Sequence, residues 1–317
     1  MKKFVWMFSG EGSQYYQMAE DLYSKSANFR AHLQQLDELV LRQAGLSVIK
    51  EVFDPARSKA DNMDQIRLTH PALFCIQHAL ASTLLDAGKR ADYVLGMSLG
   101  ELVAAAVGGA VATEEALGMV IAQSQIFTSV CPPGGMLAIL DSPSMMQARP
   151  DLFAGVELAG INYGRHFVVA GAMDRLSHIS DEIIRTDGLG QLLPVKFGFH
   201  SSLIDPAQTA CLQRAQSIEL RPLQIPMVSC MSGNLVDQLS PQHFWQVARG
   251  AMHFQEAFRT LEQSCDDELV YVDLGPGGTM ANFVKRNLMP QSRSKFHSIV
   301  TPFGQDKARL DEFLKAH

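Results

Sequence analysis

The sequence predicts an α/β protein in which a larger parallel-sheet domain carries a smaller inserted domain, and three observations predict it. Short apolar, β-prone segments alternate with helical patterns at both ends of the chain, which is typical of a parallel sheet covered on both faces. The middle of the chain instead follows the order strand, helix, strand, strand, helix, strand. The chain has 317 residues, 47% of them hydrophobic, enough for one large core with a smaller domain inserted.

The ends of the chain supply the elements of the larger domain. The first segment predicts a strand over 3–8, a glycine-rich turn, and helical spacing over 14–25 and 28–44. The last part predicts a strand over 269–274, a second glycine-rich turn, and a helix over 280–286. We expect these strands to pair in one sheet.

A further helix is expected to open at Thr69 as its N-cap, with Pro71 near its first position and Gly88 as its stop. The next apolar run, 93–95, predicts a strand, and the alanine-rich run after it, 101–106, predicts a helix.

The middle of the chain predicts a ferredoxin-like βαββαβ domain over 131–197, inserted between 1–130 and 198–317. Its expected strands are 135–140, 155–161, 166–170 and 191–197, and its expected helices are 142–148 and 176–185. Ligand sites favour the boundary between two domains and the carboxyl ends of parallel strands, so we expect the site there.

Composition excludes several classes of function. The net charge is −6 and no basic run occurs, which argues against nucleic-acid binding. The N-terminal apolar run is too short for a signal peptide, and no run is long enough to span a membrane. The five cysteines are scattered without C-x-x-C spacing, so zinc and disulfide frameworks are not expected. We expect a cytoplasmic monomer with no metal.

Residues 96–100, Gly-Met-Ser-Leu-Gly, fit the G-x-S-x-G pattern between the predicted strand and helix. This arrangement is typical of a nucleophile elbow, in which Ser98 stands at a sharp turn beside a helix N-terminus. The flanking glycines allow the turn because they have no Cβ. The alternative is an ordinary Gly/Ser turn without catalytic function.

His200 is the best-placed base among the ten histidines, because it directly follows the last predicted strand of the inserted domain. The alternative is a surface loop histidine. The first glycine-rich turn, 9–14, is expected to face the same strand ends as Ser98. Its backbone N–H groups, together with that of Leu99, could bind an oxyanion, although the turn could equally be an ordinary βα loop.

Five motifs in the same order resemble a known family. Residues 8–14 (FSGEGSQ) resemble FPGQGSQ, residues 96–101 (GMSLGE) resemble GHSLGE, and residues 198–201 (GFHS) resemble AFHS. Asn162 with the later VVAG resembles NxNSPxxVVIAG, and residues 273–277 (DLGPG) resemble EIGPG. The chain is therefore similar to malonyl-CoA:acyl-carrier-protein transacylases and polyketide synthase acyltransferases, whose fold combines an α/β-hydrolase-like domain with a ferredoxin-like one.

The resemblance implies a ping-pong reaction in which Ser98 attacks an acyl thioester and His200 acts as base and then as acid. It implies that the backbone amides of Leu99 and Glu11 hold the oxyanion. The partner would be an acyl carrier protein, whose phosphopantetheine arm (or CoA) belongs to the substrate, with no bound cofactor. The candidate substrate pocket consists of Gln14, Met97, Gln123, Ser124, Gln125, Asn162, Phe197, Phe199 and Val247.

Departures from the family pattern narrow the substrate. Malonyl-loading members carry an Arg in the helix after the elbow, but no Lys or Arg occurs between Arg90 and Arg149. Burying the malonyl carboxylate without a cation costs several kcal/mol, so malonyl-CoA is not the expected substrate. Met97 replaces a His, and Phe197 stands where malonyl-selective members often have His. Both changes favour an apolar acyl group.

Two further departures concern the catalytic machinery. The residue that should orient the histidine aligns with Val247, so Gln246 or a backbone carbonyl is expected to take this role. Glu11 replaces Gln, which keeps the backbone donor but brings a carboxylate near the oxyanion, where it could slow the chemistry or position a water.

This pattern resembles the stand-alone acyl hydrolases of trans-acyltransferase polyketide pathways, which remove stalled acyl groups from carrier proteins. The alternatives are a transferase for a non-carboxylated acyl group, a non-catalytic carrier-protein-binding protein, and an unrelated serine esterase. Carrier proteins are acidic, so we expect a basic surface near the site. Its candidate members are Arg165, Lys196, Lys285 and Arg286.

Overall fold

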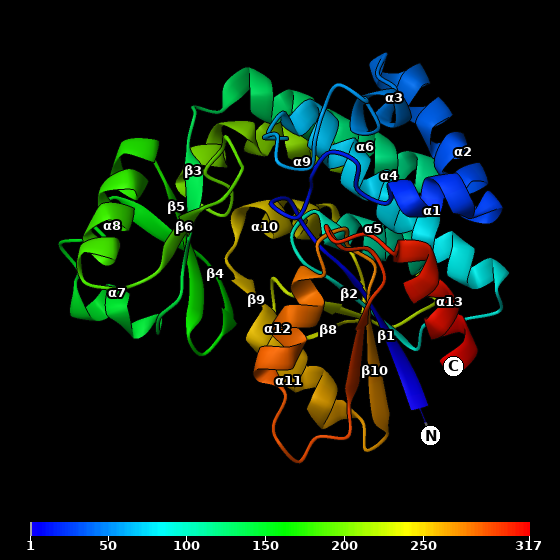
Figure 1. The fold of residues 1–317 in the computed structure, drawn as a ribbon. Coiled ribbons are helices and arrows are strands. Elements are labelled where there is room, and N and C mark those ends of the chain that lie inside the picture. The colour runs from blue at the N-terminus through cyan, green and yellow to red at the C-terminus, as the bar shows by residue number, and fades with distance from the viewer. Residues whose placement is uncertain (1) are drawn as a thin grey trace.

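The computed structural model describes residues 2–317, which form two sheets with their own helices (Figure 1). The larger sheet has the strand order β11-β10-β1-β2-β7-β8. Its strands are β1 (Lys2–Phe8), β2 (Tyr93–Gly96), β7 (Met227–Ser229), β8 (Leu235–Val236), β10 (Glu268–Asp273) and β11 (Lys295–Ser298). All pair in parallel except the edge strand β8, which is antiparallel to β7.

Helices cover both faces of this sheet, because side chains along a strand alternate between its faces. On β1, Trp6 and Phe8 pack into one core, whereas Val5 and Met7 pack into another. The helices on the Trp6 face are α1 (Glu20–Lys25), α2 (Ala27–Ala44), α3 (Val48–Val52), α4 (Ile66–Asp86), α5 (Gly100–Val107), α6 (Thr113–Val130) and α13 (Asp306–Ala316). The helices on the opposite face are α11 (Phe254–Ser264) and α12 (Thr279–Asn287).

The second sheet lies at the left in Figure 1 and has the order β6-β3-β5-β4-β9. It contains β3 (Gly135–Ile139), β4 (Val156–Tyr163), β5 (His166–Gly171), β6 (Gly190–Leu192) and β9 (Met252–His253), with helices α7 (Ser144–Ala148) and α8 (Met173–Arg185). The first four strands pair antiparallel in ferredoxin-like order. The predicted α/β class, an α/β-hydrolase-like sheet with a ferredoxin-like subdomain, is confirmed.

Strand β9 joins the two parts of the molecule. It pairs in parallel with β4, although it comes from the chain after residue 197. Residues 131–197 therefore do not build this sheet alone, and the exact domain boundaries stay a prediction. The remaining helices are a 3₁₀ helix (Ser202–Ala207), α9 (Gln208–Gln216) and α10 (Pro241–Arg249). Within residues 2–317, no helix has the length and apolarity needed to cross a membrane.

The helix predicted from Thr69 begins earlier. α4 starts at Ile66, with Gln65 at its N-cap, so Pro71 lies inside the helix and Thr69 is not a cap. The Thr69 hydroxyl instead donates to the Glu11 carboxylate at 3.0 Å. A tertiary contact thus replaces the local capping bond that the sequence indicated.

Two other predicted elements are shorter than expected. Residues 14–19 are not helical, because the Gln14 side chain accepts from the Gly12 amide and Gln17 and Ala19 have φ angles of 64° and 61°. The strand predicted over 191–197 ends at Leu192. Two residues later Pro194 has no N–H with which to continue a ladder.

Candidate active site

Ser98 stands between β2 and α5 with a φ angle of 54°, in the left-handed region that is rare for non-glycine residues. The turn is packed too tightly for side chains on either flank. A Cβ at Gly96 would overlap the Glu101 backbone, and a Cβ at Gly100 would overlap the Phe8 carbonyl. The sequence Gly-Met-Ser-Leu-Gly therefore folds into the sharp turn expected of a nucleophile elbow.

His200 lies against Ser98. Its Nε2 is 3.0 Å from the Ser98 Oγ, and its Nδ1 is 2.8 Å from the carbonyl oxygen of Gly250. A carbonyl only accepts, so Nδ1 carries the hydrogen and the Nε2 lone pair faces the Ser98 hydroxyl. Burial, the largest cause, and the positive charge of Arg249 together lower the pKa of His200 to about 4, against the opposing effect of the Gly250 bond. His200 is thus neutral at pH 7 and can accept a proton.

The group that orients His200 is a backbone carbonyl, one of the two possibilities that the sequence left open. Gly250 follows the end of α10. Gln246 is exposed and has no side-chain contact with His200, and Val247 lines a cavity instead. Any residue type has a carbonyl, so no sequence pattern could have identified Gly250.

The backbone amides of Leu99 and Glu11 have no hydrogen-bond partner among residues 2–317. The turn that carries Glu11 packs directly on the elbow, since a Cβ at Gly10 would lie 2.8 Å from the Met97 carbonyl oxygen. Two unpaired N–H groups beside Ser98 suit an anionic oxygen.

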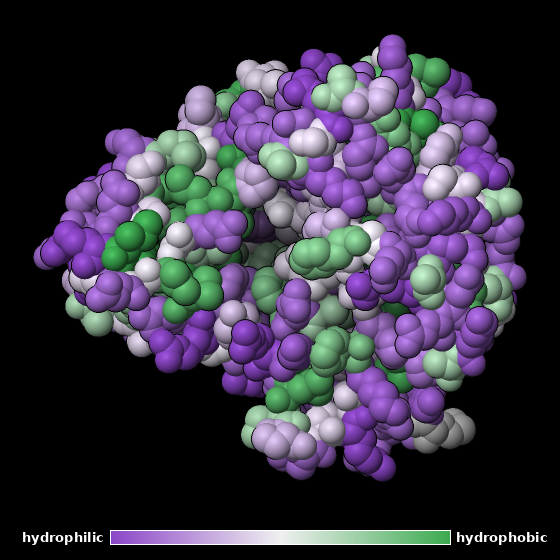
Figure 2. Space-filling model, viewed as in Figure 1, coloured by the Kyte–Doolittle hydropathy of each residue, from purple (hydrophilic) through white to green (hydrophobic). Residues whose placement is uncertain are grey.

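A cavity of about 380 Å³ opens between the two sheets and borders Ser98 and His200. Figure 2 shows the surface hollowed at this place, with hydrophobic residues around the hollow. Much of the lining is apolar, as in most small-molecule sites. The lining residues used below are Glu11, Met97, Asn162, His166, Phe199 and Met252.

A second cavity, of about 30 Å³, also borders Ser98. Its lining combines apolar side chains with a few buried polar groups. The lining residues are Glu11, His70, Ser98, Leu99, Leu102, Gln123, Phe127, Phe199, Phe244, Val247 and Ala248. Neither cavity is lined by any Lys or Arg, and Glu11 lines both.

Five predicted pocket residues line these cavities: Met97, Asn162 and Phe199 the larger one, and Gln123, Val247 and again Phe199 the smaller one. The other four, Gln14, Ser124, Gln125 and Phe197, line neither.

The contacts of three of these four residues explain why. Gln14 holds the first turn through the Gly12 amide and the Met63 carbonyl. Ser124 donates to the carbonyl of Ile121 in its own helix. Only one side of α6 faces the cavity, so neighbouring residues of the helix do not all line it. Phe197 packs beside Phe199, with ring centroids 6.0 Å apart.

The sequence analysis missed two histidines at the site. His70 pairs with Glu11 in the smaller cavity, and His166 on β5 accepts a hydrogen bond from Asn162 in the larger one. Burial lowers the pKa of His166. His70 and Glu11 are 59 positions apart, and this spacing carries no local signal.

A family model described as "Acyl transferase domain" matches residues 5–316 of the chain. The chain belongs to the acyl transferase domain family. An acyl transferase domain indicates an enzyme that transfers acyl groups, in agreement with the resemblance seen in the motifs.

Curated relatives of this acyl transferase domain come from polyketide biosynthesis. It is 40% identical to the polyketide biosynthesis acyltransferase homolog PksD of Bacillus subtilis, covering 97% of this chain and 94% of the relative. It is 38% identical to the homolog BaeD of Bacillus velezensis, again over 97% and 94%. Among solved structures, the loading acyltransferase of the avermectin modular polyketide synthase has a TM-score of 0.89 at 21% identity, covering 99% of each chain, and shares the fold.

Proposed function

We propose that this acyl transferase domain protein is an acyl-carrier-protein acyl hydrolase, which removes stalled acyl groups in polyketide biosynthesis through an acyl–Ser98 intermediate. One observation carries the proposal. Ser98 and His200 form a hydrogen-bonded pair between two cavities whose lining holds a carboxylate and no Lys or Arg.

In the first step the Ser98 Oγ attacks the thioester carbonyl carbon while its proton passes to Nε2 of His200. The oxyanion is held by the amides of Leu99 and Glu11, both otherwise unpaired. The Gly250 carbonyl stabilises the imidazolium through Nδ1–H. The intermediate collapses by breaking the C–S bond, and His200 returns its proton to the leaving phosphopantetheine thiolate.

In the second step water attacks the acyl–Ser98 ester and gives a proton to His200. Collapse of the second tetrahedral intermediate breaks the C–O bond to Ser98, which recovers that proton from His200. The products are a free carboxylic acid and regenerated enzyme. The reaction uses no group beyond the thioester, water and the side chains described.

Malonyl is disfavoured by the residues around Ser98. A malonyl carboxylate buried without a cation loses several kcal/mol, about a thousandfold in specificity. Gln123, in the stretch that corresponds to the Arg-bearing helix of malonyl-loading members, lines the smaller cavity and carries no charge. Glu11 lies in the same cavity, so a second carboxylate there would also meet a like charge.

The proposed partner is an acyl carrier protein, because PksD and BaeD are named as polyketide biosynthesis acyltransferase homologs. The larger cavity would take the phosphopantetheine arm. Of the four candidate basic residues, Lys285 and Arg286 are exposed on α12. Arg165 lies 3.9 Å from Asp141, and Lys196 lies 2.8 Å from Asp64, so both are partly neutralised.

The second candidate is a transferase that moves a non-carboxylated acyl group between carrier proteins or from CoA. The family description favours it directly, since acyl transfer is its named activity. Both candidates share the acyl–Ser98 intermediate and differ only in whether water or a second thiol resolves it.

The test is incubation with a panel of acyl-carrier proteins, with and without a second holo-carrier, followed by intact mass. We expect free acid and holo-carrier without any acceptor. Transfer that outpaces hydrolysis would replace the hydrolase by the transferase, and efficient malonyl loading would overturn the argument from the missing cation. Ser98→Ala is expected to lower either activity at least about a thousandfold. Unchanged turnover would remove Ser98 from the mechanism, and carrier binding without turnover of any acyl group would indicate a binding protein.

A further inference from the structure

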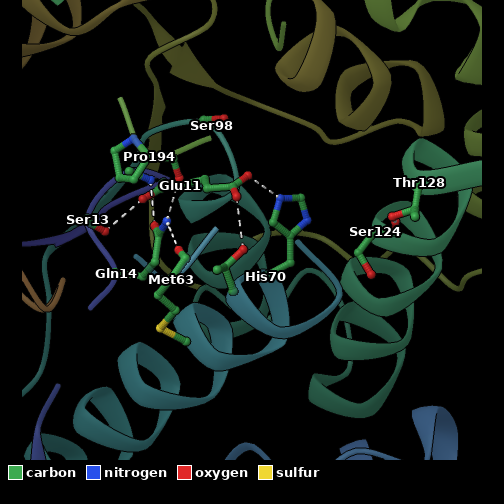
Figure 3. A network of polar contacts seen from close by, with 12 residues as sticks. Glu11, Ser13, Gln14, Met63, His70, Ser98, Ser124, Thr128 and Pro194 are labelled. Atoms are coloured by element: carbon green, nitrogen blue, oxygen red, sulfur yellow. Dashed lines mark hydrogen bonds and ion pairs between the residues drawn. The ribbon is translucent and has the colours of Figure 1, made fainter. Parts of the chain in front are cut away.

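The smaller cavity contains a buried polar cluster that the proposed mechanism does not use. The Glu11 carboxylate accepts from the Thr69 hydroxyl at 3.0 Å and pairs with Nε2 of His70 at 2.8 Å. The side chains of Glu11 and His70 are each 5% exposed. Figure 3 shows Glu11 between Ser98 and His70, with the His70 ring turned toward the helix that carries Ser124 and Thr128.

This pairing leaves one nitrogen of His70 without a partner. A carboxylate accepts, so Nε2 of His70 carries a hydrogen and donates it to Glu11. Nδ1 is buried without any hydrogen bond, and in the neutral form of the ring it is an acceptor. An unsatisfied buried acceptor costs about 1–3 kcal/mol, so this atom calls for a donor inside the cavity.

Gln123 is a second unsatisfied group in the same cavity. Gln123 as a residue is 5% exposed, and no residue from 2 to 317 hydrogen-bonds to its side-chain amide. An amide offers N–H donors as well as an acceptor oxygen. The cavity thus presents both an unpaired acceptor and unpaired donors, surrounded by the apolar side chains of Phe127, Phe199 and Phe244.

A hydroxyl satisfies both groups at once, because it donates and accepts. A methyl group satisfies neither, and a carboxylate offers no donor to Nδ1 and lies near Glu11. The volume of about 30 Å³ is room for one or two waters, or for about two or three heavy atoms at the end of a chain.

We propose that the small cavity is the acyl-end subsite of the enzyme and that it selects short hydroxyacyl groups, whose hydroxyl donates to His70 Nδ1 and accepts from Gln123. Glu11 is the positioning residue that holds His70 in the required tautomer. The proposal rests on the acyl–Ser98 chemistry proposed above. Beyond that chemistry, it specifies the substrate class, thioesters of short hydroxyacyl groups.

The test measures binding, so that a failure of hydrolysis does not obscure it. The Ser98→Ala protein is titrated by calorimetry with S-acyl pantetheines in two isosteric pairs, glycolyl against propionyl and 3-hydroxypropionyl against butyryl. We expect the hydroxyacyl member of at least one pair to bind about tenfold more tightly. Equal dissociation constants within both pairs would overturn the subsite, with water alone filling the cavity, even if the enzyme hydrolyses thioesters.

Two further variants in the Ser98→Ala background test the contributions of the two nitrogens of His70 to binding separately. His70→Asn retains an acceptor near the position of Nδ1 but loses the contact with Glu11, whereas His70→Gln retains a donor toward Glu11 but loses the acceptor. The hydroxyacyl preference should persist in the Asn variant and disappear in the Gln variant. Loss of the preference in the Asn variant with retention in the Gln variant, or its loss in both folded proteins, would mean that a group other than Nδ1 of His70 recognises the hydroxyl. Thr69→Val, which removes the other Glu11 contact, is the matched control and should retain the preference.

Discussion

At the residue scale, Ser98 and His200 both have positive φ angles, 54° and 62°. Non-glycine residues in this region cost about 1–3 kcal/mol each, so the surrounding contacts must hold them there. For His200 these contacts include the hydrogen bond from its backbone N–H to the Ala248 carbonyl, at 3.0 Å, and the hydrogen bond from Nδ1 to the Gly250 carbonyl. The contacts that hold both residues in this conformation also fix the distance between Nε2 of His200 and Oγ of Ser98.

The pH dependence of acylation follows from His200. Its pKa is lowered to about 4 by burial, so the neutral, proton-accepting form persists below the ordinary histidine range. The rate of Ser98 acylation should stay level between about pH 8 and about pH 5 and fall about tenfold per unit below about pH 4. Quenched-flow mass spectrometry with acetyl-carrier protein measures this profile. A midpoint near the ordinary histidine pKa would contradict the burial argument.

A malonyl site should be recoverable only by two changes together. In Gln123→Arg alone, the new guanidinium would share the small cavity with the Glu11 carboxylate and pair with it. With Glu11→Gln added, the guanidinium is free for the malonyl carboxylate. We expect the malonyl-to-acetyl ratio of kcat/KM for acylation to rise at least about tenfold in the double variant over the single one. Equal ratios in the two variants would show that Glu11 does not control the acyl charge.

At the element scale, buried Glu101 ties the elbow helix α5 to two other elements. Its carboxylate accepts from the Ser229 hydroxyl at 2.8 Å and from the Met231 amide at 3.1 Å, and pairs with His243 on α10 at 2.9 Å. α10 also leads to Gly250, which orients His200. This network therefore connects α5, the helix after Ser98, to α10, the helix that leads to the carbonyl bound by His200.

Removing this carboxylate should be costly. Glu101→Ala leaves the Ser229 hydroxyl without an acceptor and His243 without its partner, whereas the Met231 amide keeps its bond to the Ser229 oxygen. We expect a loss of about 3–5 kcal/mol in the free energy of unfolding, measured by urea denaturation. The matched control is Glu182→Ala, which breaks an exposed pair with Arg185 and should change stability by less than about 1 kcal/mol. Similar losses of stability in the two variants would show that the buried network does not stabilise the fold more than an exposed ion pair does.

The elbow also depends on close contact between α5 and β1. Gly100→Ala places a methyl group on the Phe8 carbonyl, and we expect a loss of about 3 kcal/mol or more, seen as a lower melting temperature and lost acylation. Gly164→Ala is the control, because its Cβ would meet only Gln255, at 3.9 Å. A stable, active Gly100→Ala protein would show that the turn can relax.

At the scale of the whole molecule, the larger cavity depends on how β9, which comes from the chain after residue 197, joins the second sheet. Gly160 on β4 faces Met252 on β9, and both line this cavity. A Cβ at Gly160 would lie 3.1 Å from the Met252 carbonyl oxygen, so the junction has little free space.

Gly160→Val should therefore push β9 away from β4. We expect a loss of about 1–3 kcal/mol in stability and a lower kcat/KM for acyl-carrier protein, measured by calorimetry and single-turnover assays. Gly164→Val, in the turn of the same hairpin, should leave both quantities nearly unchanged. A fully active and stable Gly160→Val protein would mean that the junction does not shape the cavity.

The parts of the fold that could be predicted are those with local signals. The alternation of apolar strands with helices, and the βαββαβ order in the middle, indicated both sheets. The errors arose where a distant contact overrode a local pattern. Thr69 donates to Glu11 instead of capping α4, and Gln14 bonds the preceding turn instead of starting a helix. Strand β9 is only two residues long, too short for a periodic signal.

The sequence by itself determined the Gly-Met-Ser-Leu-Gly turn, the family, and the lack of a cation in the helix after Ser98, because each depends on residue types along a continuous segment. Only the tertiary structure decided that the Gly250 carbonyl orients His200, and that Glu11 and His70 meet beside Ser98. A backbone carbonyl has no sequence signature, and Glu11 and His70 belong to different elements. Folding alone sets both distances.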